Sequence, residues 1–145
     1  MKADDYQVNI TVPLAAPDVF HAINRVTEWW TYDLEGRSAA VGDEFTVRFG
    51  DVHTSTQKLI EVIPGERIVW LVRKSHLNFV KEKSEWTNTK ICFEMSDENG
   101  KTQVRFTHYG LVPQIACYGA CRQGWNYYIK GSLYKLLTTG KGEPG

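Results

Sequence analysis

The sequence lacks a net charge, and its hydrophobic residues form no long run. Acidic and basic side chains balance at 17 each in 145 residues, so no overall field draws the chain to nucleic acid or to an anionic membrane surface. No stretch approaches the roughly 18 apolar residues that a membrane-spanning helix requires. The first residues include no apolar segment of a secretory signal. We therefore expect a cytoplasmic protein whose partners include neither nucleic acid nor membrane.

Cysteine is scarce, which bears on disulfides and metals. The three cysteines are Cys92, Cys117 and Cys121, an odd number without a CxxC pair, and this is typical of reduced thiols in a cytosolic protein. Cys117 and Cys121 would share one face of a helix and could form a metal site with His108 or Cys92. Zinc needs about four ligands, and its usual spacings do not occur. We expect neither a metal nor a cofactor.

Aromatic residues are plentiful, at 12% of the chain, and they fill cores or line ligand pockets. The length is that of one domain, so we expect residues 1–145 to form a single unit with a sizeable core. Alternation of apolar and polar residues predicts strands over residues 6–12, 45–49, 54–63, 68–72, 91–95 and 104–108. The sequence Asp97-Glu98-Asn99-Gly100 predicts a hairpin connection between the last two.

Two short helices are predicted after the first strand. Pro17 suits a first helical turn, and apolar residues follow it at helical spacing as far as Val26. Thr27 could cap a second short turn that carries Trp29 and Trp30. Residues 75–87 show no period and are predicted to be a loop or frayed strand.

The last element is a long amphipathic helix. At Pro113 the apolar period changes from two to 3.6, which predicts a helix over residues 115–139 that ends at Gly140. The whole pattern predicts an α+β domain in which a curved antiparallel sheet wraps around the long C-terminal helix. A sheet of this shape often leaves a cavity between the layers.

The chain resembles the SRPBCC, or START-like, superfamily with its helix-grip fold. It looks most like the branch named after the C-terminal domain of the activator of the ninety-kilodalton heat-shock chaperone ATPase. The resemblance covers nearly the whole chain through an ordered set of segments: Phe20-x-x-Ile23 with Trp29-Trp30, Val41-Gly42-Asp43-x-Phe45, Trp86-x-x-Thr89-x-Ile91-x-Phe93-Glu94, Val104-x-Phe106-Thr107-His108-x-Gly110-Leu111, and Gly124-Trp125-x-x-Tyr128-Ile129-x-x-Ser132-Leu133. It implies a ligand cavity and, through the family name, a link to chaperones and stress response.

Candidate site residues lie on the predicted inward faces. Three tryptophans could form the wall of a cavity or simply fill the core, and both readings stay open. His108 is predicted to point inward, where it would bond a neighbour or contact a ligand. His21, His53 and His76 are expected on surfaces or loops. The predicted ligand-binding residues are Trp30, Phe45, Trp70, Phe93, Phe106, His108, Tyr118, Cys121, Trp125 and Tyr128.

Three functions compete. The first is a non-enzymatic domain, monomeric or weakly dimeric, that binds a small apolar or amphipathic molecule between the sheet and the C-terminal helix. The second is a protein-interaction module that modulates a chaperone or another partner. The third is an enzyme like the polyketide cyclases that share the fold. The mostly apolar inward positions and the lack of paired carboxylates argue against the enzyme, so we predict no catalytic residue.

Overall fold

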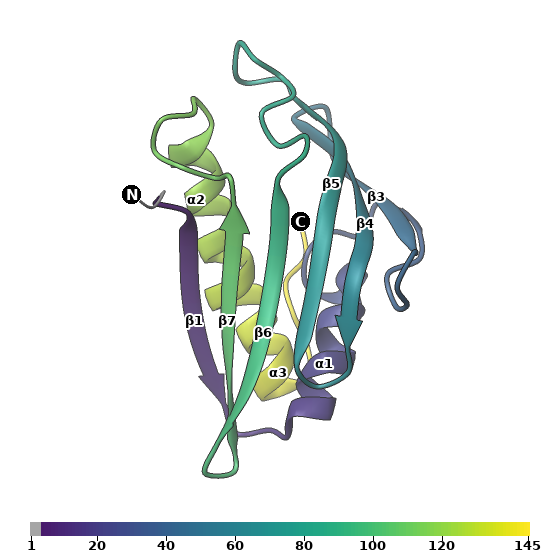
Figure 1. Cartoon of the computed structure of the whole chain (residues 1–145), viewed down its shortest axis with the longest axis vertical. Coiled ribbons are helices and arrows are strands. Elements are labelled where there is room, and N and C mark those ends of the chain that lie inside the picture. The colour runs from purple at the N-terminus through teal and green to yellow at the C-terminus, as the bar shows by residue number, and fades with distance from the viewer. Residues whose placement is uncertain (1–3) are drawn as a thin grey trace.

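The computed structural model describes residues 4–145, which form a seven-stranded antiparallel sheet with a long helix lying across one face (Figure 1). In chain order the elements are β1 (Tyr6–Val12), α1 (Ala16–Asn24), the 3₁₀ helix η1 (Val26–Glu28), β2 (Leu34–Gly36), β3 (Glu44–Phe49), β4 (His53–Ile63), β5 (Arg67–Leu77), β6 (Lys90–Glu98), β7 (Lys101–Tyr109), α2 (Tyr118–Trp125), the π-helical segment η2 (Asn126–Leu133) and α3 (Tyr134–Thr139). The strand order is β1-β7-β6-β5-β4-β3-β2. The predicted α+β helix-grip architecture is confirmed.

The register of β7 decides which of its side chains face the helix. The chain turns from β6 to β7 at Asn99 and Gly100, as the sequence predicted, and Glu98 pairs with Lys101. Farther along, Phe93 lies opposite Phe106, and Ile91 lies opposite His108. All four of these side chains are fully buried. His108 therefore points inward, as its alternation with Phe106 indicated.

The long helix runs without a break from Tyr118 to Thr139 and ends at Gly140. It begins at Tyr118, later than predicted, and the Glu85 carboxylate accepts hydrogen bonds at 2.9 Å from the backbone N–H groups of Ala116 and Cys117 in the turn just before it. The central segment η2 is π-helical, with wider turns than an α-helix, and it buries Ile129, Ser132 and Leu133.

All five tryptophans are buried and lie together beneath the helix. We call Trp29, Trp30, Trp70, Trp86 and Trp125 the tryptophan cluster. Trp30 is its centre, since its ring centroid lies between 5.0 and 6.4 Å from those of the other four. The segment after η1, strand β5, the connection between β5 and β6, and the long helix are thus joined in one aromatic core.

The local structure differs from the sequence expectations in three places. β5 extends through residues 75–77, the start of a segment predicted to be a loop or frayed strand, because Ser75 and Leu77 pair with β4. The short strand β2 gave no sequence signal. The turn before Trp29 starts at Val26 with Arg25 as its cap, so Thr27 is not the cap.

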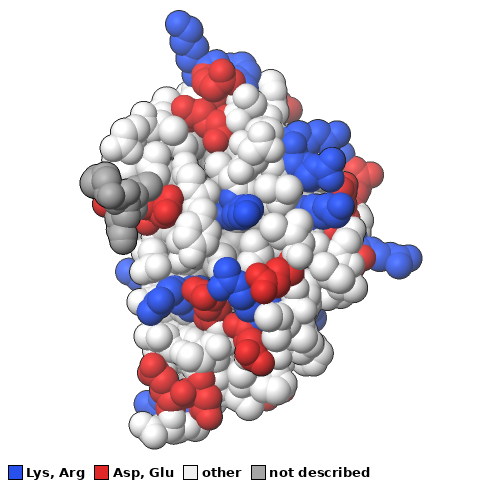
Figure 2. Space-filling view, in the orientation of Figure 1, with Lys and Arg blue, Asp and Glu red and all other residues white. Residues whose placement is uncertain are grey.

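The outer face of the sheet carries mixed charges. Figure 2 shows basic and acidic side chains interspersed over the sheet face seen in Figure 1. Arg67 lies between Glu61 and Glu94, at 2.8 and 2.6 Å. No helix within residues 4–145 combines the length and apolarity needed to cross a membrane.

Candidate ligand-binding pocket

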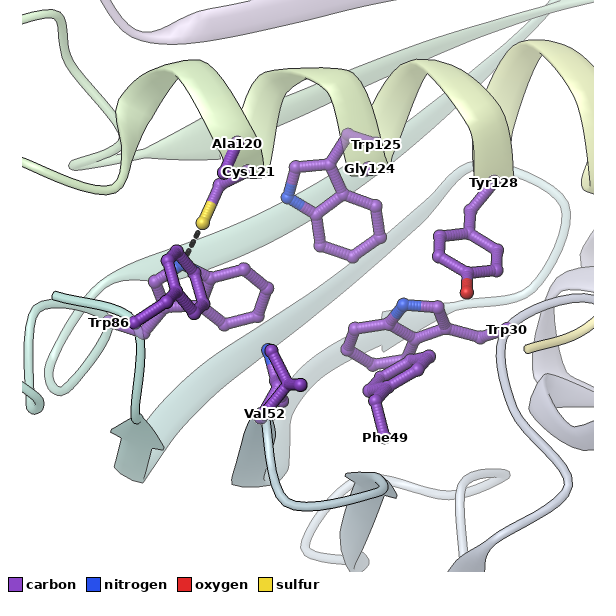
Figure 3. Close-up of a pocket in the computed structure, with 11 residues that line it drawn as sticks. Trp30, Phe49, Val52, Trp86, Ala120, Cys121, Gly124, Trp125 and Tyr128 are labelled. Atoms are coloured by element: carbon purple, nitrogen blue, oxygen red, sulfur yellow. Dashed lines mark hydrogen bonds between the residues drawn. The ribbon is translucent and has the colours of Figure 1, made fainter.

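A pocket of about 270 Å³ lies between the start of the long helix and one end of the sheet (Figure 3). Its wall is formed by Trp30, Phe49, Val52, His53, Phe79, Trp86, Ala120, Cys121, Gly124, Trp125 and Tyr128. Val52 and Phe79 are 49% and 43% exposed, so they form the rim toward solvent. None of the residues that line it, in the part of the chain that the structure describes, is Asp, Glu, Lys or Arg.

Four parts of the chain supply the wall, and one of them is the segment after η1, which contributes Trp30. Helical spacing brings Cys121, Trp125 and Tyr128 to one face of the helix, and Figure 3 shows them directed toward Trp86, Trp30 and Phe49. The end of β3, the following turn and the start of β4 supply one side of the pocket. The segment between β5 and β6 supplies Trp86. The pocket is therefore made by long-range contacts.

Trp86 is fixed although it belongs to a connecting segment. Its indole N–H donates to the sulfur of Cys121 across 3.3 Å, and its ring stacks on that of Trp125 with centroids 5.7 Å apart. The preceding residue, Glu85, accepts hydrogen bonds from the turn just before the long helix. These contacts hold the Trp86 side chain in its place in the pocket wall.

His108 lies behind the pocket. Its Nδ1 accepts the indole N–H of Trp125 at 3.0 Å, and its Nε2 lies 2.8 Å from the hydroxyl oxygen of Thr89. Burial, together with a smaller effect of His53, lowers its pKa to about 3. The imidazole is therefore neutral at pH 7, and both of its nitrogens are engaged by protein groups.

His53 is a wall residue that sequence reasoning missed. The expectation that it lies on a surface or loop is wrong, because β4 begins at His53 and turns the ring inward, leaving it 9% exposed. Its Nε2 lies 2.7 Å from the hydroxyl of Ser55. Burial lowers its pKa to about 4. The pocket thus gains a neutral polar group.

Cys121 contributes a sulfur to the wall, and Cys117 lies one turn before it. The Cys117 thiol and the Trp86 indole both donate to the Cys121 sulfur, which lowers the pKa of Cys121. The same hydrogen bond and burial raise the pKa of Cys117. All three cysteines are free thiols, and no group of three potential metal ligands occurs within residues 4–145.

Four of the ten predicted ligand-binding residues line the pocket: Trp30, Cys121, Trp125 and Tyr128. Five lie deeper in the core and are fully buried: Phe45, Trp70, Phe93, Phe106 and His108. Tyr118 is partly buried at the start of the helix and does not line the pocket. The wall residues outside the predicted set are Phe49, Val52, His53, Phe79, Trp86, Ala120 and Gly124. For two of these the sequence held a signal of a role in the pocket. Gly124 is a glycine inside the predicted helix, and Phe49 ends an apolar alternation.

The family model described as Activator of Hsp90 ATPase homolog 1-like protein matches residues 17–138. The chain belongs to this family. The resemblance read from the sequence is thereby confirmed. No curated protein matches the chain significantly.

Solved structures share its fold. The solution structure of the Aha1 dimer from Colwellia psychrerythraea is 24% identical, covers 95% of this chain and 98% of its own, and has a TM-score of 0.77. SSP2350 from Staphylococcus saprophyticus is 16% identical over 96% and 95% of the two chains, with a TM-score of 0.71. DynU16, described as a protein in the dynemicin biosynthetic locus, is 18% identical with a TM-score of 0.69, and the match covers 97% of this chain and 49% of that one.

Proposed function

We propose that this protein binds a small, neutral, largely apolar molecule in the pocket between the long helix and the sheet. The observation that carries the proposal is an open pocket with aromatic walls and no charged side chain. Pockets of this composition are the usual form of small-molecule sites. Its volume of about 270 Å³ lies just below the range of roughly 300–1,000 Å³ typical of drug-sized ligands. The ligand body should therefore be compact, such as a bicyclic aromatic ring system.

The electrostatics of the interior favour a neutral ligand. No Asp, Glu, Lys or Arg side chain is buried within the described residues. Burial keeps the pKa of His53 and that of His108 low, at about 4 and about 3, so both rings are uncharged at pH 7. A charged ligand group would lose its hydration without gaining a partner.

A thermal-shift screen tests the proposal. The library should contain fatty acids, flavonoids, aromatic polyketides and small neutral aromatic compounds. Binding stabilises the folded state by about 2.7 kcal/mol when the free ligand is at a hundredfold excess over its dissociation constant. We expect at least one stabilising compound, and the neutral aromatic compounds should give the largest shifts.

Two matched glycine substitutions show whether such a compound occupies this pocket. A Cβ added at Gly124, in the wall, meets no atom within 4 Å, and the same is true at Gly119 on the exposed side of α2. Gly124→Leu should fill the pocket, and Gly119→Leu should not, while both improve helix propensity by a similar amount. Loss of binding in Gly124→Leu alone supports the proposal. No stabilising compound for the wild type, or equal binding by both variants, contradicts it.

The second candidate is a protein-interaction module, and the specific observation for it is the dimeric state of the Aha1 relative. The exposed rim residues Val52 and Phe79 would suit such a contact. Light scattering after size-exclusion chromatography distinguishes a monomer from a weak homodimer, and stimulation of a chaperone ATPase by the purified protein tests the role that the family name suggests.

The enzyme alternative has less support. A cyclase must position and polarise a carbonyl group, and the polar groups of this wall are His53, the Cys121 sulfur, the Tyr128 hydroxyl and the indole N–H groups of the tryptophans.

We also propose a cytoplasmic location. The three free thiols support it, because they are typical of a reducing compartment.

A further inference from the structure

Three polar atoms deep in the core have no hydrogen-bond partner. They are Oε1 and Nε2 of Gln57 and the indole Nε1 of Trp70, and both side chains are fully buried. Buried polar groups are almost always paired, and each unpaired one costs roughly 1–3 kcal/mol. A glutamine with both ends unpaired beside an unpaired indole therefore indicates a place where a further polar group belongs.

The sheet register makes these two side chains neighbours. On β4 and β5, Gln57 lies opposite Val72 and Leu59 lies opposite Trp70. Gln57 and Trp70 are thus diagonal positions on the same inner face, about 7–8 Å apart in such a ladder. On the other side, Phe45 lies opposite Gln57, and its ring contacts that of Trp70 with centroids 4.9 Å apart. The register shift between Thr56 and Gln57 is a local irregularity of the kind that re-aims side chains near sites.

One indole connects Trp70 with the pocket. Trp30 lines the pocket, and its ring also stacks on that of Trp70 with centroids 5.7 Å apart and planes 21° from parallel. The inner face of β4 connects the same two places, because His53 lines the pocket and bonds Ser55, two residues before Gln57. Trp30 is therefore the side chain that would have to move for a ligand in the pocket to reach Trp70.

We propose that Gln57 and Trp70 form the inner end of the binding site and bind the polar head of the ligand once Trp30 moves aside. This inference rests on the proposed function. Gln57 offers one acceptor and two donor hydrogens, and Trp70 offers one donor. A ligand head that is complementary to Gln57 and Trp70 therefore carries both a hydrogen-bond acceptor and a donor. It is also neutral, since no Asp, Glu, Lys or Arg side chain is buried in the described part of the chain. The ligand class is an aromatic compound with a carboxamide or a protonated carboxylic acid.

The test compares two probes of the same shape, 2-naphthamide and 2-methylnaphthalene. Their dissociation constants are measured by NMR titration for the wild type and three variants. Gln57→Met removes the buried amide at similar side-chain length, and Trp70→Phe removes the indole N–H. Gln123→Met makes the first change on the exposed side of α2. Gln57→Met should fold, because replacing unpaired buried polar atoms by apolar ones is neutral or stabilising.

We expect the wild type to prefer the amide. Gln57→Met should reduce the preference for the amide at least tenfold, while its affinity for 2-methylnaphthalene stays as in the wild type. Trp70→Phe should reduce the preference for the amide by a smaller factor, and Gln123→Met should leave that preference unchanged. An unchanged preference in Gln57→Met, as expected if a buried water satisfies the amide, overturns this inference and leaves the proposed function standing. Loss of both probes from folded Gln57→Met also contradicts it, since Gln57 would then shape the pocket. If neither probe binds the wild type, this inference fails together with the proposed function.

Discussion

Trp125 donates its indole N–H to Nδ1 of His108 across 3.0 Å, and this hydrogen bond fixes the proton of the imidazole on Nε2. The Nε2–H then donates to the Thr89 hydroxyl at 2.8 Å, and that hydroxyl donates to the backbone carbonyl of Trp86 at 2.6 Å. Trp125 and Trp86 both line the pocket. His108 is therefore a positioning residue, because these hydrogen bonds connect it to both of them.

Stability should fall as the solution is acidified. In the folded state burial lowers the pKa of His53 to about 4, and that of His108 to about 3, from an ordinary value of 6.5. The unfolded chain therefore binds protons first as the pH falls, so stability is greatest above pH 6.5 and is lost progressively toward pH 4 and below. Between about pH 7 and about pH 5 each histidine should account for roughly 2 kcal/mol of the loss.

His108→Asn tests this assignment, because an asparagine oxygen can still accept the Trp125 N–H. Urea unfolding at both pH values should show a smaller difference in the free energy of unfolding for this variant. The control is His21→Asn, on the exposed side of α1, which should leave the difference as in the wild type. An unchanged difference in His108→Asn would contradict the assignment.

Trp125 should contribute strongly to stability. Its side chain is 2% exposed and contacts Trp30, Trp86 and Phe106. Trp125→Ala should reduce the free energy of unfolding by roughly 3–5 kcal/mol. Tyr134→Ala, at a position that is 40% exposed on the same helix, is the control and should cost less than about 1 kcal/mol. Similar losses for both, measured by chemical denaturation, would show that Trp125 is not a core residue.

Gly110 should tolerate alanine less well than Gly100. Both have positive φ, 100° and 84°, so alanine strains the backbone at each by roughly 1–3 kcal/mol. At Gly110 the new Cβ would also lie 2.6 Å from Cγ2 of Thr89, whereas at Gly100 it meets nothing within 4 Å. Gly110→Ala should therefore be less stable than Gly100→Ala by about 1–3 kcal/mol. Equal losses in urea unfolding would mean that Thr89 moves freely.

One thiol should react before the other two. Cys121 is 8% exposed and lines the pocket, and hydrogen bonds to its sulfur lower its pKa. Cys92 and Cys117 are fully buried, and burial raises the pKa of Cys92 to about 11. Because the thiolate is the reactive form, a chromogenic disulfide reagent should modify Cys121 first and the others only after denaturation.

Cys121→Ser should lose the fast phase of that reaction.

Metal analysis of protein prepared in a reducing cytosol should find no zinc. About one zinc per chain, lost on substitution of Cys117 or Cys121, would contradict this expectation.

The sequence predicted the architecture well because each strand buries one face and the helix buries one stripe, so the period of apolar residues identifies both. The pocket was less predictable. Trp86 comes from a segment without a period, and its burial depends on Glu85 and Cys121, which lie far apart in the chain. Gln57 has a polar side chain in a predicted strand, and only the register of β4 against its neighbours shows that it points inward.

The tryptophan cluster has an optical consequence. Every indole of the protein lies in this cluster, and the planes of Trp86, Trp30 and Trp125 differ by only 12 to 26°. Rings this close and this nearly parallel should couple their electronic transitions and give a strong couplet in the circular dichroism spectrum. The indole emission of the protein then originates from one place, the tryptophan cluster, and three of its five members line the pocket. A spectrometer can follow events there without any added label, while the outer strands β2 and β3, which carry no tryptophan, contribute nothing to the indole signal.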